Sequence, residues 1–188
     1  MIEVNKVLKL SATMLQLKDI ENILSSSSQL SEVGNDDLEL LLSCLNLVCE
    51  QIASDYIHLI SKKNVVTTNG FIPWSAFDGI QLYKIVKVKD SKGESLNFKI
   101  VADGIVCNSD NVQVVYSYFP QEYNFNEFIS DFNCSVDERI LALGVCFEYL
   151  FIKGNSTDAQ IWESRFTNAM KNIVAKRKEV VLPKRRWW

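Results

Sequence analysis

The sequence feature that most constrains the fold is a long amphipathic stretch between residues 38 and 60. Its apolar side chains recur at intervals of three and four residues over about six turns, at Leu38, Leu41, Leu42, Leu45, Val48, Cys49, Ile52, Ala53, Tyr56, and Leu59 or Ile60. This spacing predicts one long α-helix, and Asn35-Asp36-Asp37 is a typical helix start. An apolar stripe of this length needs a broad apolar surface to cover it, so we expect other helices to pack against it.

Further helices are predicted on both sides of this stretch. Residues 4–24 have mostly helical spacing, which indicates one or two short helices. Ser135 and Glu138 have the spacing of a capping box, and the helix they begin is expected to end at Gly154. Ser156 or Thr157 is expected to cap a last helix.

Between the helices the apolar pattern changes to one that indicates β-strands. Strands are predicted over 80–89, 96–100, 105–107 and 112–118, and Asp103-Gly104 is a typical hairpin turn. These segments predict a small antiparallel meander of four strands.

Together the elements predict an α+β fold: an antiparallel helical bundle with an inserted small antiparallel β-meander and an extended C-terminal tail. We expect a single domain over residues 1–188, which suits the length of the chain. The bundle is assigned to 1–63 and 134–178, the β insertion to 64–121 and the docking tail to 179–188. No stretch approaches the ~20 apolar residues of a membrane span, and the N-terminus lacks the pattern of a signal peptide. We therefore expect no membrane partner.

Few residues have the chemistry of a catalytic or metal site. His58 is the single histidine, and the five cysteines (Cys44, Cys49, Cys107, Cys134 and Cys146) include no C-x-x-C pair. The cysteines are expected to be reduced, buried thiols. No glycine-rich phosphate loop or calcium-loop spacing occurs. We expect no enzyme activity, no metal and no cofactor, and a hydrolase acting through His58 is kept as an alternative.

Positive charge is concentrated at the C-terminus. Residues 171–188 have a net charge of +6, whereas residues 1–170 have a net charge of −9. This asymmetry indicates docking to an acidic surface. The residues predicted to form the protein interface combine strand-forming, basic and indole side chains: Lys178, Val180, Val181, Leu182, Lys184, Arg185, Arg186, Trp187 and Trp188.

The tail has more than one possible binding partner. It is expected to anchor in a neighbouring subunit or to pack on its own bundle, and nucleic acid or lipid is a further alternative. Nucleic-acid binders usually reach a high isoelectric point, whereas this chain has a value of about 5.3.

Several segments resemble small proteins encoded in prophage structural-gene clusters. They are Leu41–Tyr56, Tyr116–Pro120, Ala142–Leu150, Ile161–Phe166 and Lys184–Trp188. The expected layout of bundle, β insertion and reaching tail is similar to that of head–tail connector (adaptor) proteins of tailed bacteriophages, of the tail tubular protein A type.

This resemblance implies a structural protein of the virion, made in the host bacterial cytoplasm and placed at the head–tail junction. Such proteins form a homo-oligomeric ring, commonly dodecameric, between the portal protein and the next tail-ring protein. DNA passes through the ring without specific binding, and the C-terminal segment, here Lys178 to Trp188, commonly inserts into the portal. The alternative function is a non-virion prophage or bacterial interaction protein, such as an assembly chaperone.

Overall fold

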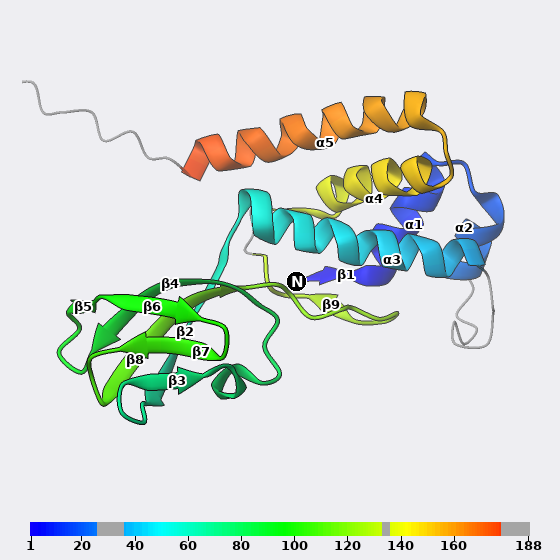
Figure 1. Cartoon of the computed structure of the whole chain (residues 1–188). Coiled ribbons are helices and arrows are strands. Elements are labelled where there is room, and N and C mark those ends of the chain that lie inside the picture. The colour runs from blue at the N-terminus through cyan, green and yellow to red at the C-terminus, as the bar shows by residue number, and fades with distance from the viewer. Residues whose placement is uncertain (26–35, 133–135, 178–188) are drawn as a thin grey trace, which may run out of the picture. The chain divides into compact units, whose positions relative to one another are not determined.

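The computed structural model describes residues 1–25, 36–132 and 136–177. The chain divides into two compact units, which are described separately. The helical unit comprises Met1–Val48 and Tyr123–Trp188, and the β unit comprises Cys49–Glu122. Figure 1 shows the elements of both units.

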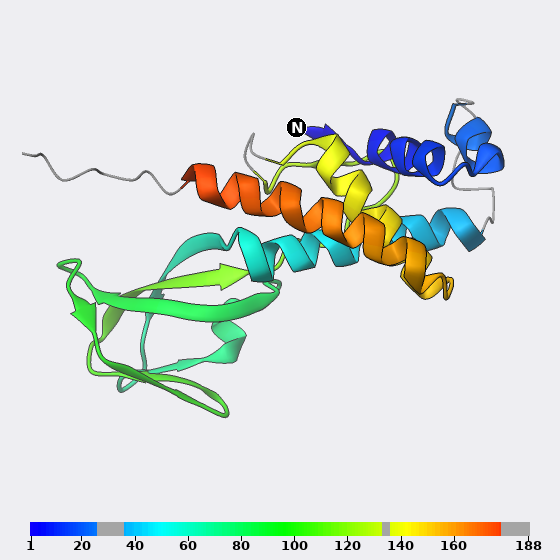
Figure 2. The same cartoon turned by 90° about the horizontal axis from the view of Figure 1, so that it is seen from above.

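The described part of the chain contains five α-helices. They are α1 (Val4–Met14), α2 (Lys18–Ser25), α3 (Asp36–Gln51), α4 (Glu138–Ile152) and α5 (Ser156–Arg177). Figure 2 shows α4 between α1 and α5. In α4 the six consecutive residues Leu141–Cys146 are buried, so this helix is covered on several sides and forms the centre of the helical unit.

The start of α4 differs from the predicted capping box. Asp137 is the N-cap residue, and its carboxylate accepts a hydrogen bond of 2.8 Å from the backbone N–H of Ile140. The predicted cap, Ser135, lies outside the described residues. An aspartate performs the same capping role as a serine, so sequence spacing alone favoured the wrong one of two nearby polar residues.

A short extended segment, residues 123–132, is held against the helical unit and is called the strap. Within it β9 (Phe128–Ile129) pairs antiparallel with β1 (Ile2–Glu3). Asn46 of α3 forms two hydrogen bonds with the backbone of Tyr123, donating to its carbonyl oxygen at 3.1 Å and accepting from its N–H at 2.9 Å. The strap therefore joins α3 to the N-terminus of the chain.

The β unit consists mainly of two antiparallel sheets. Its strands are β2 (Leu59–Val66), β3 (Phe71–Pro73), β4 (Leu82–Asp90), β5 (Ser95–Leu96), β6 (Phe98–Val101), β7 (Gly104–Cys107) and β8 (Asn111–Tyr118). One sheet has the order β2-β8-β4-β5 and the other the order β3-β7-β6. Ile72 and Ile105 of the second sheet share an apolar core with Val88 and Val114 of the first. The two sheets thus bury their apolar faces together, as in other layered β structures.

The predicted fold class is wrong, because the sheets are a large part of the molecule and not a small meander inserted in a helical bundle. About 27% of the chain is strand, in three antiparallel sheets alongside the five helices of the described residues. Two unpredicted strands of the β unit, β2 and β3, account for much of the difference. They extend one sheet and complete a second.

The first residues of β2 fall within the predicted long helix, because Leu59 and Ile60 continue the apolar spacing of α3. In the structure α3 ends at Gln51 and is followed by a π-helical turn, Ile52–Tyr56. From Leu59 the chain is extended and pairs over its whole length with β8. The conformation of β2 is determined by its pairing with residues of β8, which lie about fifty residues away in sequence. A spacing pattern within one segment contains no information about such distant partners.

The residues of β3 lie at the start of a segment, Phe71 to Asp78, that Gly70, Pro73 and Gly79 indicate to be turn-rich. The nearby glycines instead allow close approach of backbones. A Cβ atom on Gly70 would lie 2.2 Å from the carbonyl oxygen of Cys107, and one on Gly104 would lie 2.1 Å from that of Ile72. Gly70 also has a φ of +75°, which favours glycine. These glycines therefore fit β3 against β7.

No helix in the described ranges is both long and apolar enough to cross a membrane.

Candidate docking surface

The predicted interface lies outside the residues that the structure describes. This applies to Lys178 and to the whole tail 179–188, including Trp187 and Trp188. Its role as an anchor therefore stays a prediction. The described surface offers other candidate sites, which sequence reasoning did not identify.

His58, the candidate catalytic base, follows the π-helical turn in the β unit. Its Nδ1 atom lies 3.1 Å from the carbonyl oxygen of Ala53, and its ring centroid lies 6.2 Å from that of Tyr83. A hydrolytic triad requires a hydroxyl or thiol on one side of the imidazole and an orienting group on the other. The carbonyl oxygen of Ala53 can orient the His58 ring, whereas no serine, threonine or cysteine side chain of the described residues forms a hydrogen bond with it.

The described cysteines are buried free thiols: Cys44, Cys49, Cys107 and Cys146. Burial raises the pKa of Cys44 and of Cys146 to about 12, with Glu148 contributing further at Cys44. A thiol needs its thiolate form to act as a nucleophile or metal ligand. Among the residues that the structure describes, no three His, Cys, Asp or Glu side chains are grouped to hold a metal ion.

A groove of about 620 Å³ lies between α1, α4 and α5 in the helical unit. We call it the three-helix groove. Its apolar lining includes Met14 from α1, Ile140 and Leu143 from α4, and Ala169 from α5. Leu143 is buried, and the other three are half-buried. The groove therefore exposes apolar surface to a ligand while its walls belong to packed helices.

Aromatic and positively charged side chains complete this groove. Trp162 of α5 is half-buried, and the guanidinium of Arg165 lies over its ring at 5.0 Å from the centroid. Arg139 of α4 is the other charged residue in the lining. Tryptophan and arginine are the residue types most enriched among those that dominate binding energy at protein interfaces.

Sequence reasoning recognised only part of this site. The sequence spacing places Trp162 and Ala169 on the apolar face of the last helix, and Ile140 and Leu143 on that of the preceding one. The spacing within each helix was thus informative. The convergence of these faces with Met14, more than a hundred residues away, depends on tertiary packing that spacing cannot supply.

A second apolar feature lies where α4 turns into α5. Phe151 and Ile152 at the end of α4 are 61% and 49% exposed, and Ile161 in the second turn of α5 is 51% exposed. The ring of Phe151 contacts that of Phe147, with centroids 6.2 Å apart. We call Phe151, Ile152 and Ile161 the hairpin-end residues. Single exposed apolar residues are ordinary, whereas a contiguous exposed apolar patch marks an interaction surface.

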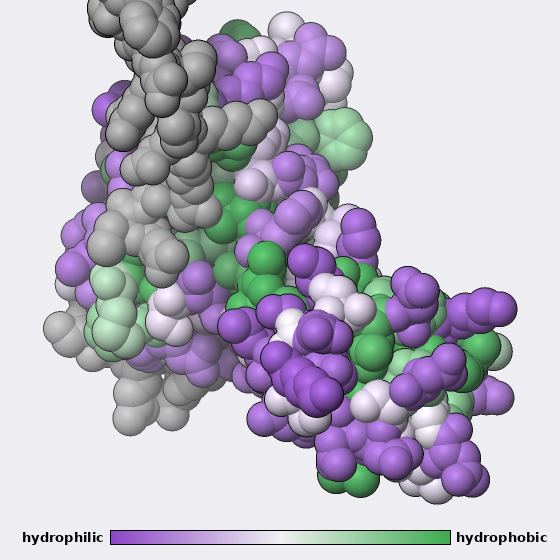
Figure 3. Space-filling model, turned by 90° about the vertical axis from the view of Figure 1, so that its left-hand side faces the viewer, coloured by the Kyte–Doolittle hydropathy of each residue, from purple (hydrophilic) through white to green (hydrophobic). Residues whose placement is uncertain are grey.

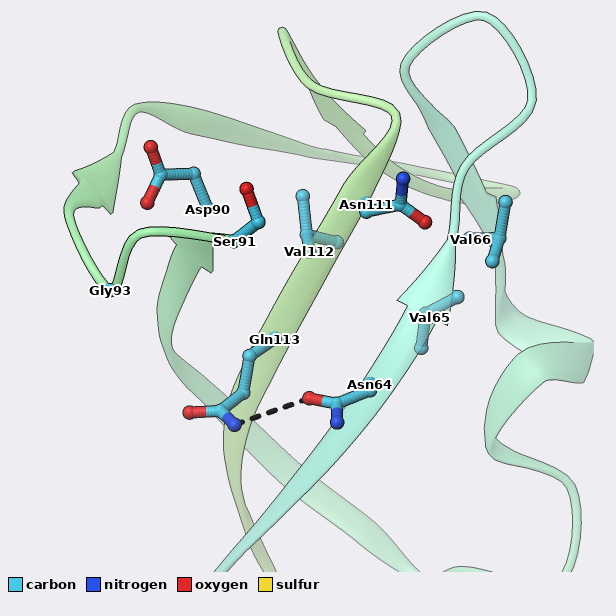
Figure 4. A pocket seen from close by; sticks show the side chains of 9 residues that line it. All are labelled: Asn64, Val65, Val66, Asp90, Ser91, Gly93, Asn111, Val112 and Gln113. Atoms are coloured by element: carbon cyan, nitrogen blue, oxygen red, sulfur yellow. Dashed lines mark hydrogen bonds between the residues drawn. The ribbon is translucent and has the colours of Figure 1, made fainter.

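The β unit has a hollow of about 440 Å³, shown in Figure 4. Its side chains come from β2, from β8 and from the turn that follows β4. Gln113 donates a hydrogen bond of 3.1 Å to the Oδ1 atom of Asn64. One oxygen of Asp90 accepts hydrogen bonds from the backbone of Lys92 and Glu94. These polar groups are engaged in holding the turn and the strand pair, which is a structural role.

On the face shown in Figure 3, hydrophobic residues reach the surface between hydrophilic ones.

An ion pair is found on the helical unit, where Lys153 at the end of α4 lies 2.6 Å from Asp37 at the start of α3. Hydrogen bonds from Lys153 and Tyr149 lower the pKa of Asp37 against the opposing effect of burial. This ion pair joins the end of α4 to the start of α3. A carboxylate with a lowered pKa remains ionised, so Asp37 has a structural role at this contact.

A scan against models of protein families found none that matches the chain, and a search of curated proteins found no match.

Proposed function

We propose that this protein is a non-enzymatic adaptor that works by binding other protein chains. In its specific form the proposal is a subunit of a ring at the head–tail junction of a tailed bacteriophage, which binds the portal protein and the next tail-ring protein. The ring and its location rest on the sequence resemblance, and the docking function rests on the surface of the helical unit.

The observation that carries the docking function is the exposure of the hairpin-end residues. Phe151, Ile152 and Ile161 leave large apolar side chains in water although α4 has a well-packed core beside them. Burying such a side chain contributes about 1.5–3 kcal/mol. Because these side chains are about half exposed, a neighbouring protein chain that covers them would contribute roughly half of that free energy for each one.

The oligomeric state tests this proposal. The expected result is that the purified full-length protein forms a ring-sized assembly in analytical ultracentrifugation, and that purified virions of the encoding phage contain it. The double variant Phe151→Ser, Ile161→Ser is expected to weaken assembly. Leu47→Ser, which alters another exposed apolar residue of the helical unit, is the matched control and is expected to assemble normally.

Two results would contradict the specific form of the proposal. A protein that stays monomeric or dimeric and is absent from virions would be better explained as an assembly chaperone. Equal assembly by the double variant and the wild type would remove the hairpin end from the interface.

The tail provides a separate test of portal binding. We propose that Lys178 to Trp188 anchors in the portal, because basic and indole side chains have hot-spot chemistry. Deletion of residues 179–188 is expected to leave the melting temperature nearly unchanged and to yield heads without tails. Unfolding of the truncated protein would instead show that the tail belongs to its own core, and normal tail attachment would show that it is dispensable.

A further inference from the structure

The three-helix groove has the shape and charge of a binding site for a particular kind of protein segment. We propose that it binds an amphipathic helix of a partner chain, whose apolar side chains enter the groove and whose carboxylates pair with Arg139 and Arg165. This inference rests on the proposed docking function, but it concerns a different surface from the hairpin end.

The apolar lining argues for a helical occupant. Met14, Ile140, Leu143 and Ala169 present apolar surface along the space between α4 and its neighbours. A helix laid in such a groove buries a row of side chains at three- and four-residue intervals. The volume of about 620 Å³ holds several leucine-sized side chains, so anchors on successive turns can enter together.

The charge of the groove argues for acidic residues beside these anchors. Acidic side chains outnumber basic ones in the described part of the helical unit, whereas the two charged residues that line the groove are both arginines. The ion pairs recorded among the described residues are Lys6 with Glu3 and Lys153 with Asp37. Neither arginine of the groove is therefore neutralised by a carboxylate within the described chain.

The geometry of Arg165 favours a carboxylate partner. Its guanidinium lies over the ring of Trp162, 5.0 Å from the centroid. Stacking of this kind restricts the side chain and leaves the edge of the guanidinium free for two parallel hydrogen bonds to a carboxylate. Arg139 comes from α4 and Arg165 from α5, so each of the two helices contributes one positive charge to the groove.

The remaining charges make nucleic acid and anionic membranes less suitable occupants. The full chain has a net charge of −3 and an isoelectric point of about 5.3. Binding to a phosphate backbone normally requires a track of basic residues, and the groove supplies two arginines around an apolar floor. A short acidic and apolar protein segment matches both features.

Binding of synthetic peptides to the full-length protein tests the inference. The probe is a fluorescein-labelled peptide of about 15 residues, with leucines at helical spacing and glutamates between them. Its counterpart has lysine in place of each glutamate. Fluorescence anisotropy is measured with the wild type, with Arg139→Glu, Arg165→Glu, and with Lys9→Glu, Lys171→Glu. The last variant makes the same charge change at exposed lysines outside the groove.

The expected result is that the wild type binds the glutamate peptide and that the arginine double variant loses at least about tenfold in affinity, since hydrogen bonds to charged groups are strong. The lysine double variant should bind nearly as the wild type does. The arginine double variant should in turn prefer the lysine peptide, which a variant that had merely unfolded would not do.

Three outcomes would overturn the inference. They are failure of the glutamate peptide to bind the wild type, equal loss of affinity in both double variants, and arginine-dependent binding of a single-stranded oligonucleotide in place of the peptide. None of these results would contradict the proposed ring assembly through the hairpin end. Conversely, if the protein binds the peptide but never assembles, the groove inference stands and the proposed ring fails.

Discussion

Gly144 shows how closely single side chains are fitted in the helical unit. It lies in α4, where Val48 of α3 and Phe166 of α5 approach its Cα. A Cβ atom at this position would lie 2.7 Å from Cγ1 of Val48 and 3.2 Å from Cε2 of Phe166. Both neighbours are essentially buried, so neither can move freely. The glycine therefore sets the distance between three helices.

Substitution of Gly144 by alanine is expected to lower the free energy of unfolding by about 1–3 kcal/mol, the usual cost of overpacking. Urea denaturation measures this change. In a double-mutant cycle, Val48→Ala should offset part of the loss by making room for the new methyl group. A wild-type unfolding midpoint for Gly144→Ala would show that α3 and α5 are less tightly fitted than the distances indicate.

Glu148, also in α4, is a half-buried carboxylate whose pKa is raised, first by burial and then by the nearby charge of Glu163. The folded state therefore holds this proton more tightly than the unfolded state does. The contribution of Glu148 to stability is most favourable below its ordinary pKa of about 4.5 and is lost as pH rises through the folded pKa.

We accordingly expect Glu148→Gln to be more stable than the wild type at neutral pH, with the difference shrinking as pH falls toward 4.5. Thermal unfolding followed by circular dichroism across this pH range measures the effect. Glu122→Gln is the control, because this residue is exposed in the β unit. A stability difference that does not change with pH would show that Glu148 acts through packing and not through its charge.

At the level of elements, the existence and approximate position of the helices were largely predictable, because short-range signals indicate them, whereas the end of α3 and the start of α4 differ from the prediction. The start of α3 at Asp36 agrees with the predicted helix start at Asn35-Asp36-Asp37, whereas α5 already includes Ser156, one of the two residues predicted to cap it. The strand predicted over 112–118 lies within β8. These signals depend on capping, charge and alternation within a few residues, which a sequence shows directly.

The elements that were not predicted depend on partners far away in sequence. The pairing of β2 with β8, and that of β3 with β7, join segments separated by some thirty to fifty residues. The strap was also missed, since Asn46 and Tyr123 are 77 residues apart. The three-helix groove could not be predicted for the same reason, because its lining comes from helices that are far apart in sequence. The apolar face of each helix could be predicted from its own spacing.

The attachment of the strap to α3 yields a test at this scale. Asn46→Ala removes both hydrogen bonds between the side chain of residue 46 and the backbone of Tyr123. The partly buried backbone N–H and C=O groups of Tyr123 then lose these two partners. The expected loss of stability is about 1–3 kcal/mol. Hydrogen exchange should also become faster at Tyr123, while exchange in the β unit should stay as in the wild type.

Asn46→Asp retains the acceptor and loses the donor, so it should fall between the wild type and Asn46→Ala. Unchanged exchange at Tyr123 in the alanine variant would show that β1 and β9 hold the strap without help from α3.

For the whole molecule, the distribution of charge predicts weak binding to DNA. Residues 1–170 have a net charge of −9. This negative charge repels the phosphate groups of DNA. Full-length protein is expected to bind duplex DNA weakly in a filter assay at physiological salt, with a shallow dependence on salt concentration. Tight binding that falls steeply with salt would indicate several phosphate contacts and would contradict a ring through which DNA slides.

The position of β2 has a further consequence for the whole molecule. This strand forms one edge of its sheet, and exposed Ile60 and Val66 stand near its two ends with exposed Lys62 between them. An unpaired edge invites pairing with the same edge of another copy, and a lysine there makes such contact costly. Lys62 is therefore expected to hinder edge-to-edge pairing between separate molecules. Replacing it with valine should leave each molecule folded and still send the population into insoluble aggregates.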